Sequence, residues 1–307
     1  MLASFRLFDR PYLLLVLANL FWAGNIVLGR YIAHDIPPVT LSFLRWAGAM
    51  LLILPFTWKE LVEGWPVIRQ NLVLFFLLSA CGIGSYNAIA YWGLKYTEAL
   101  NALLIQSLGP LLVALWGFLL WRDRLSPRQL GGILTSLIGV VVILMRGDIT
   151  HLASLRFNIG DVLTLAALVI YGLYASLLRK RPDISPLAFL AVTIVGGTLF
   201  LLPLTVWELV SGTVTVNVTP KTVATVFYMA LFASLLAYLF FIRGAEIVGN
   251  NRASPFFHLM PVFGSVIAIL FLGETPHLFH AIGFALVLSG VFVATTARTP
   301  LAAEPAP

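Results

Sequence analysis

The sequence predicts an all-α integral membrane protein of ten transmembrane helices, arranged as two inverted repeats of five helices. Three observations lead to this fold class. Of the 307 residues, 60% are apolar and only 10% are charged, whereas about a quarter of the residues of a soluble domain are charged. Ten apolar segments are each long enough to cross a hydrocarbon core about 30 Å thick. Glycine, proline and acidic positions of the first half recur in the second.

Each expected span is a run of about 20 mostly apolar residues bounded by turn or capping residues, such as Trp65-Pro66 and Ser126-Pro127. Runs such as 111–120 are apolar on every side, which favours helices over the alternating strands of a membrane barrel. The first run is longer than the apolar region of a signal peptide, so we interpret it as an uncleaved span. The expected spans cover roughly residues 12–33, 38–58, 70–92, 98–120, 127–145, 159–178, 186–207, 221–242, 251–272 and 277–297.

The chain repeats itself at intervals of about 150 residues. One shift places Asp35-Ile36-Pro37-Pro38 on Asp183-Ile184-Ser185-Pro186 and Pro55 on Pro203; a slightly longer one places Asp123 on Glu274. Each half holds five spans, an odd number, so the halves must enter the membrane from opposite sides. The expected repeats are residues 12–145 and 159–297.

Loop charge predicts the orientation. With the N-terminus in the cytoplasm, 13 basic residues fall in inside segments and five in outside segments, while Arg45 lies within a span. This bias predicts a multi-pass plasma (inner) membrane protein with both termini cytoplasmic. The same rule accounts for the net charge of +6, so we expect no nucleic-acid partner.

The residue types exclude several kinds of chemistry. The single cysteine, Cys81, rules out an intrachain disulfide and a multi-thiolate metal site. We find no metal-binding helix motif and no phosphate-binding glycine loop, so neither a metal nor a cofactor is expected. Acidic residues fall in loops, tails or span ends, with Glu98 and Asp161 nearest to a membrane interior. Intramembrane carboxylates usually mark ion coupling, so the sequence predicts facilitated or weakly coupled transport.

Several motifs resemble the drug/metabolite transporter superfamily, in its ten-helix branch built from EamA domains. They are Pro38-Val39-Thr40-Leu41-Ser42-Phe43-Leu44-Arg45-Trp46, Ser107-Leu108-Gly109-Pro110, Leu259-Met260-Pro261 and Phe271-Leu272-Gly273-Glu274. The aromatic-rich spans are similar to those of the amino-acid exporters. Asp123 departs from the family's usual glutamate but keeps the charge. The resemblance implies a pathway between the halves and export of amino acids or related metabolites.

Arg45 is a charged residue inside a span, which is costly unless it faces protein, water or a partner. Two interpretations stay open. Arg45 either clamps the carboxylate of a substrate or holds carbonyl oxygens of a neighbouring helix. His258 has a similar ambiguity, between contact with a substrate or proton and a packing role. Ser254, His258, Pro261 and Ser265 are spaced as one face of an α-helix.

An inverted repeat places the pathway between its halves near the midplane. Polar and aromatic residues of the spans could meet a zwitterion there, with amides and hydroxyls for its head groups and aromatic faces for its side chain. The candidate substrate-binding residues are Trp22, Asn25, Arg45, Tyr86, Asn87, Tyr91, Tyr174, Tyr238, Ser254 and His258.

The hypothesis is therefore a secondary transporter that exports small organic metabolites, above all amino acids with aromatic or hydrophobic side chains, by alternating access. The alternative substrates are drug-like cations and nucleotide-sugar-type metabolites. A membrane-embedded enzyme or a structural subunit is disfavoured, because the sequence has no clustered catalytic groups and a scaffold needs no polar-lined repeat. The expected partners are a small-molecule substrate and membrane lipid. The oligomeric state is left open, with a monomer as the simplest expectation.

Overall fold

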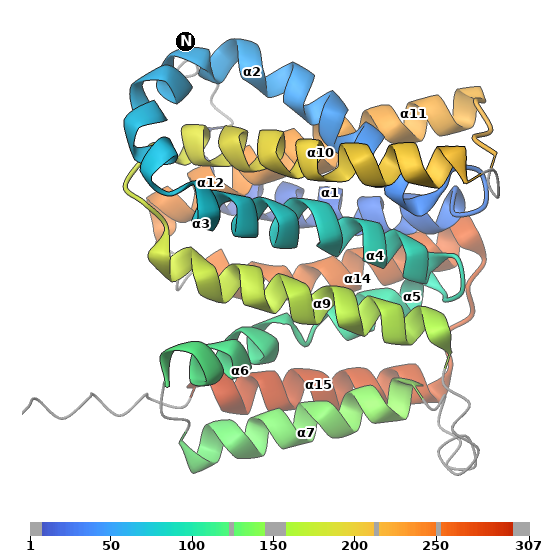
Figure 1. Cartoon of the computed structure of the whole chain (residues 1–307). Helices are drawn as coiled ribbons and strands as arrows, with labels where there is room; N and C mark the ends of the chain where they lie inside the picture. The colour runs from blue at the N-terminus through green and yellow to red at the C-terminus, as the bar shows by residue number, and fades with distance from the viewer. Residues whose placement is uncertain (1–7, 123–125, 145–157, 212–214, 250–252, 297–307) are drawn as a thin grey trace, which may run out of the picture.

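The computed structural model describes residues 8–122, 126–144, 158–211, 215–249 and 253–296, and these ranges form a stack of helices (Figure 1). The helical segments of the first half are α1 (Pro11–Tyr31), α2 (Pro38–Gln70), α3 (Leu72–Leu78), η1 (Ser79–Ser85), α4 (Tyr86–Leu94), α5 (Ala99–Gln106), α6 (Gly109–Trp121) and α7 (Pro127–Leu144). Those of the second half are α9 (Ile159–Leu177), η2 (Leu178–Lys180), α10 (Pro186–Val210), α11 (Pro220–Tyr228), η3 (Met229–Leu236), α12 (Ala237–Val248), η4 (Ser254–His258), α14 (Leu259–Ile267), η5 (Ala268–Leu272) and α15 (Leu278–Thr296).

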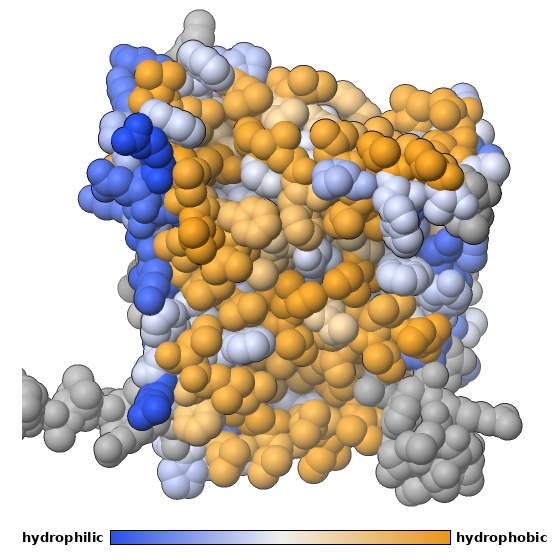
Figure 2. Space-filling view, in the orientation of Figure 1, coloured by the Kyte–Doolittle hydropathy of each residue, from blue (hydrophilic) through white to orange (hydrophobic). Residues whose placement is uncertain are grey.

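Length and composition make these helices a membrane bundle. Six helical stretches of the described chain are long and apolar enough to cross a membrane, or seven when the bent pair α5 and α6 counts as one span; three more apolar stretches are shorter. The space-filling view shows an apolar band between hydrophilic patches at the two ends of the helices (Figure 2). The predicted fold class, a ten-helix membrane protein with two repeats, is confirmed.

The helix contacts have the symmetry of an inverted repeat. Helix α2 packs against α10, α7 against α15, and α5 against α14, so each of these spans contacts its own counterpart. The contact of α1 with α12 is matched by that of α9 with α4, its equivalent after the halves are exchanged. A pathway between the halves must therefore be lined by spans of both repeats.

Proline positions explain where several helices begin and bend. Pro38 and Pro186 occupy the first turns of α2 and α10, where a missing N–H costs nothing. Pro110 cannot donate to the carbonyl of Gln106. The fourth span accordingly breaks after Gln106, restarts at Gly109 and bends by 44°.

Two span predictions need correction. Helix α2 does not end near residue 58, because it continues through the expected separator Trp65-Pro66 to Gln70. The chain from Ser254 to His258 is a 3-10 helix rather than an α-helix, with Pro255 in its first turn. A 3-10 helix has three residues per turn, so positions 254 and 258 do not share the face that α-helical spacing predicted.

Candidate functional site

Arg45 is the centre of a buried polar network between the two halves. It lies about two turns into α2, and its side chain is only 2% exposed. Nε donates to Ser234 Oγ of the second half at 2.5 Å. Nη1 donates to Asn87 Oδ1 at 2.7 Å and to the Tyr91 hydroxyl oxygen at 2.8 Å. The guanidinium thus holds the faces of both repeats together.

The network continues into the first span. The Tyr91 hydroxyl donates to Asn25 Oδ1 at 2.7 Å, and Asn87 Nδ2 donates to the Ile83 carbonyl at 3.3 Å. Asn25, Asn87 and Tyr91 are all buried. Polar groups from α1, α2, α4 and η3 therefore converge at one place inside the bundle.

Two π-helical segments at matching places in the repeats shape this region. Segment η1 directly precedes Tyr86 and Asn87, and η3 contains Ala233 and Ser234. A π-helix widens the turn and interrupts the α-helical bonding pattern, often beside functional sites. The Ala233 carbonyl accepts hydrogen bonds from Trp22 Nε1 at 3.1 Å and from Arg45 Nη2 at 3.4 Å. The π-helical turn thus supplies a backbone acceptor to the network.

The charge of Arg45 is not balanced by a carboxylate. All its hydrogen bonds go to neutral groups, and it has no ion pair with any acidic residue that the structure describes. Its carbon Cζ lies 4.6 Å from the ring centroid of Trp46, a cation–π contact. Four of the five guanidinium N–H groups have acceptors. An uncompensated charge and a spare donor suit a ligand with a negative group.

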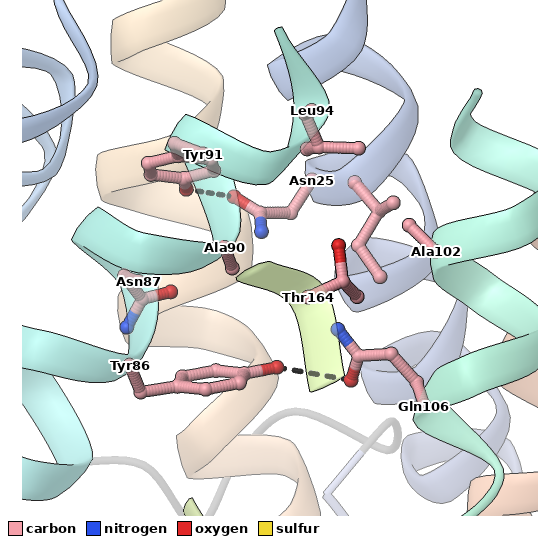
Figure 3. A pocket seen from close by; sticks show the side chains of 10 residues that line it. Asn25, Tyr86, Asn87, Ala90, Tyr91, Leu94, Ala102, Gln106 and Thr164 are labelled. Carbon is pink, nitrogen blue, oxygen red and sulfur yellow. Dashed lines mark hydrogen bonds between the residues drawn. The ribbon is translucent and has the colours of Figure 1, made fainter. Parts of the chain in front are cut away.

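A small cavity adjoins the network (Figure 3). Asn25, Asn87 and Tyr91 line it on one side, and Tyr86 donates from its hydroxyl to Gln106 Oε1 at 2.9 Å on the other. Its volume of about 20 Å³ holds about one water molecule. The described conformation is therefore closed around the site, and a metabolite could enter only if the helices moved apart.

An aromatic cluster built from both halves borders the site. Tyr238 packs edge-on against Trp22 and lies 6.1 Å from Trp46, measured between ring centroids. Trp22 stacks on Phe257 at 5.6 Å, and Phe257 contacts Phe241 at 4.7 Å. The contact of Arg45 with Trp46 joins the polar network to this aromatic cluster. The site therefore combines a cationic group with aromatic faces.

The structure brings together some of the predicted site residues and separates others. Asn25, Arg45, Asn87 and Tyr91 share the network, Tyr86 lines the cavity, and Trp22 and Tyr238 form part of the aromatic cluster. Tyr174 packs against Tyr171 at 5.6 Å and does not line the cavity. His258 is half-buried and forms no hydrogen bond within the described part of the chain. The side chain of Ser254 lies outside what the structure describes.

Sequence reasoning missed two polar residues of the cavity wall, Gln106 and Thr164. Gln106 could have been identified from the sequence, because an amide side chain inside an apolar span usually forms a hydrogen bond to another helix. Thr164 carries none, because its hydroxyl bonds to the Gly160 carbonyl of its own helix, as many membrane threonines do.

Polar contacts between the halves close one end of the bundle, which we call the far end: the end where α1 finishes and α2 begins. There Lys221 pairs with Asp35 at 2.5 Å. The buried Asp161 accepts hydrogen bonds from Thr97 and Asn101. Asn101 in turn bonds through Oδ1 to His280 at 2.9 Å. The contacts of Asn101 with Asp161 and His280 join the first turns of α5, α9 and α15.

Helix symmetry, an apolar belt and a closed polar site between two repeats define a multi-pass membrane transporter. The model of the EamA-like transporter family matches residues 9–145 and 158–296. The chain belongs to this family, and it is accordingly a transporter rather than an enzyme.

Similar proteins are transporters as well. The uncharacterized transporter YyaM of Bacillus subtilis is 31% identical over 92% of this chain and 93% of its own length. A probable terminal-alkyne amino-acid exporter of Streptantibioticus cattleyicolor is 26% identical over 73% of each chain. One crystal structure of a protein 20% identical aligns with a TM-score of 0.61 over 93% of this chain and 97% of that one. At that identity, the likeness concerns the fold alone.

Proposed function

We propose that this chain exports small carboxylate-bearing metabolites, above all amino acids with aromatic or hydrophobic side chains. The single observation that carries the proposal is the buried, uncompensated charge of Arg45 between the halves. A buried cation without a counter-ion is strongly disfavoured, and a bound carboxylate would supply that counter-ion. A guanidinium also has the planar fork that binds carboxylates in two places.

The surroundings of Arg45 support an amino acid in particular. Asn25, Asn87 and Tyr91 offer neutral oxygens that could accept from an ammonium group, and Trp22, Trp46 and Tyr238 offer faces for an apolar side chain. A cationic drug would instead be repelled by Arg45, by about 4 kcal/mol at 4 Å in a medium of dielectric constant 20. The similarity to a probable amino-acid exporter agrees with this substrate class.

Alternating access would open the site to one side at a time. In the described conformation the far end is closed by polar contacts between the halves, and the symmetry of the repeats supplies a second arrangement of the same contacts. Because the cavity wall contains no acidic side chain, we expect flux down a substrate gradient to continue after the proton gradient is collapsed.

Transport by protein reconstituted into lipid vesicles tests the substrate class. After a panel of labelled amino acids identifies a transported one, three compounds compete with it: phenylalanine, 3-phenylpropionate and phenethylamine. If Arg45 binds the carboxylate, the first two compete and the amine, which lacks a carboxylate, does not. Efficient competition by phenethylamine alone, or transport of drug-like cations or nucleotide sugars instead, would contradict the proposal.

Substitutions at the site provide a second test. Arg45→Gln removes the charge and should weaken amino-acid binding at least tenfold. Arg45→Lys keeps the charge but loses the planar guanidinium, so its affinity should lie between those of the wild type and Arg45→Gln. The matched control is Arg69→Gln, which removes an exposed arginine from the same helix and should transport normally.

A further inference from the structure

The far end of the bundle is held by a carboxylate that caps a helix of the other repeat. Glu208, near the end of α10, accepts from the backbone N–H of Val39 at 3.3 Å and of Thr40 at 2.7 Å. The Thr40 hydroxyl also donates to Glu208, at 2.8 Å. These N–H groups belong to the first turn of α2, which has no capping side chain of its own because Pro37 precedes it. The contact therefore ties the two repeats together where both helices meet the far end.

A second carboxylate does the same nearby. Glu274 accepts from the backbone N–H groups of Ala99 and Leu100, each at 2.8 Å, in the first turn of α5. A charged acceptor at a helix N-terminus satisfies unpaired donors and the helix dipole together. Both carboxylates come from the second repeat and both capped helices from the first. The far end thus has two carboxylate caps of one kind, and both must be released before it can open.

The repeat gives Glu208 a counterpart at the opposite end. The shift that places Pro55 on Pro203 also places Glu60 of α2 on Glu208 of α10. In both helices, the glutamate follows an internal proline by five residues. A proline removes one hydrogen bond of its helix and lets the following turns bend. Each helix of this pair therefore has a hinge before its carboxylate.

The turn of α2 that begins at Glu60 packs beside the start of α10, where a Cβ on Gly64 would lie 3.8 Å from Ile184 Cγ2, but Glu60 makes no such bond to the described part of the chain. Its neighbour Leu61 packs in the same apolar cluster as Phe189, in the first turn of α10. One carboxylate oxygen of Glu60 is buried and has no hydrogen-bond partner within the described part of the chain. A buried unpaired acceptor is costly and calls for an explanation.

The first turn of α10 can receive this carboxylate. Ser185 Oγ already accepts from the Ala188 N–H at 3.0 Å. Within the described part of the chain, no side chain accepts from the N–H of Leu187, the residue that corresponds to Val39. Glu60 therefore does not have to displace Ser185, because the Leu187 N–H in the first turn of α10 can donate to its carboxylate.

We propose that Glu208 and Glu60 are alternating gate residues of the transport cycle. Glu208 caps α2 when the far end is closed. When that end opens, the bond breaks, and Glu60 caps α10 to close the opposite end. The described conformation has the first contact made and the second unmade. The inference rests on the alternating access of the proposed function, but it does not depend on the substrate.

Distances between pairs of spin labels test the gate without a substrate. In a Cys81→Ser background, one pair occupies the exposed far-end positions His34 and Val210, and the other occupies the exposed positions Val62 and Asp183 at the opposite end. Pulsed electron paramagnetic resonance on the full chain in lipid nanodiscs measures the populations of long and short distances between the labels of each pair.

Glu208→Ala should lengthen the far-end distance and shorten the other, with a shift of about tenfold or more in the ratio of the two populations, because three charge-assisted hydrogen bonds are lost. Glu208→Gln keeps the size and one acceptor oxygen, so it should give a smaller shift in the same direction. Glu208→Gln also tests the gate if the alanine variant folds poorly. Adding Glu60→Ala to Glu208→Ala should return the populations toward those of the wild type.

The control is Glu246→Ala, which removes a carboxylate from an exposed ion pair with Arg243 and should move neither distance. Unchanged distances in both Glu208 variants would overturn the gate. A double variant that behaves like Glu208→Ala alone would overturn the role of Glu60. Because substrate is absent, either result leaves the assignment of Arg45 as a carboxylate site untouched, and failure of the competition assay leaves the gate untouched.

Discussion

Tyr91→Phe is the sharpest test of the site, because it deletes one oxygen atom and leaves the shape of the side chain. That hydroxyl accepts from Arg45 Nη1 and donates to Asn25 Oδ1. Without it, Asn25 Oδ1 loses its donor in a buried setting, and Arg45 loses one of its neutral acceptors. A buried polar group left unpaired costs about 1–3 kcal/mol.

This free energy sets the expected effect. If the substrate binds within the network, the apparent affinity should fall roughly five- to hundredfold. The assay is concentration-dependent amino-acid flux into lipid vesicles, with the amount of folded protein measured in parallel. Asn87→Ala removes another acceptor of Arg45 and should act in the same direction.

Tyr96→Phe is the matched control. It removes the same atom from an exposed tyrosine near the far end, and it should leave flux unchanged. Normal expression together with wild-type affinity in Tyr91→Phe would refute the assignment of the network as the substrate site. Equal losses in both tyrosine variants would show that the effect is not specific to the network.

Three further predictions concern topology, pH and packing. A cysteine at the exposed position 218 of the far end should react with a membrane-impermeant reagent in intact cells; reaction only after permeabilisation would reverse the orientation. Burial raises the pKa of Glu274 despite its two backbone bonds, so its proton is held more tightly in the closed far end than in an open one. Closure should therefore strengthen as the pH falls through the raised pKa toward the ordinary value of about 4.3, and Glu274→Gln should remove this pH dependence of the spin-label distances. At the α7–α15 contact, a Cβ on Gly139 would lie 2.7 Å from the Gly283 carbonyl oxygen. Gly139→Ala should therefore lower the free energy of unfolding by about 1–3 kcal/mol, measured as a lower midpoint of thermal unfolding. Gly131→Ala is the control, because a Cβ there would have no atom within 4 Å, and it should not lower that midpoint.

Several features of the site could be read from the chain before folding was considered. Arg45 stood out because charge inside an apolar span is rare and expensive. Asn25, Asn87 and Tyr91 stood out because polar groups there need protein partners. His258 satisfied the same criteria, yet the structure gives it no place in the network. The sequence spacing assumed an α-helix, and the 3-10 turn before Leu259 changed which way these residues face.

The sequence by itself determined the membrane location, the number of spans and the inverted repeat. These follow from apolar run lengths and from glycine, proline and acidic positions, which are local properties of the chain. Only the tertiary structure decided which polar groups meet, that Arg45 has no carboxylate beside it, and that Glu208 rather than Glu60 caps a helix. Such contacts join residues up to 211 positions apart. They depend on how two similar repeats pack, and a repeat sequence allows both arrangements without specifying which is made.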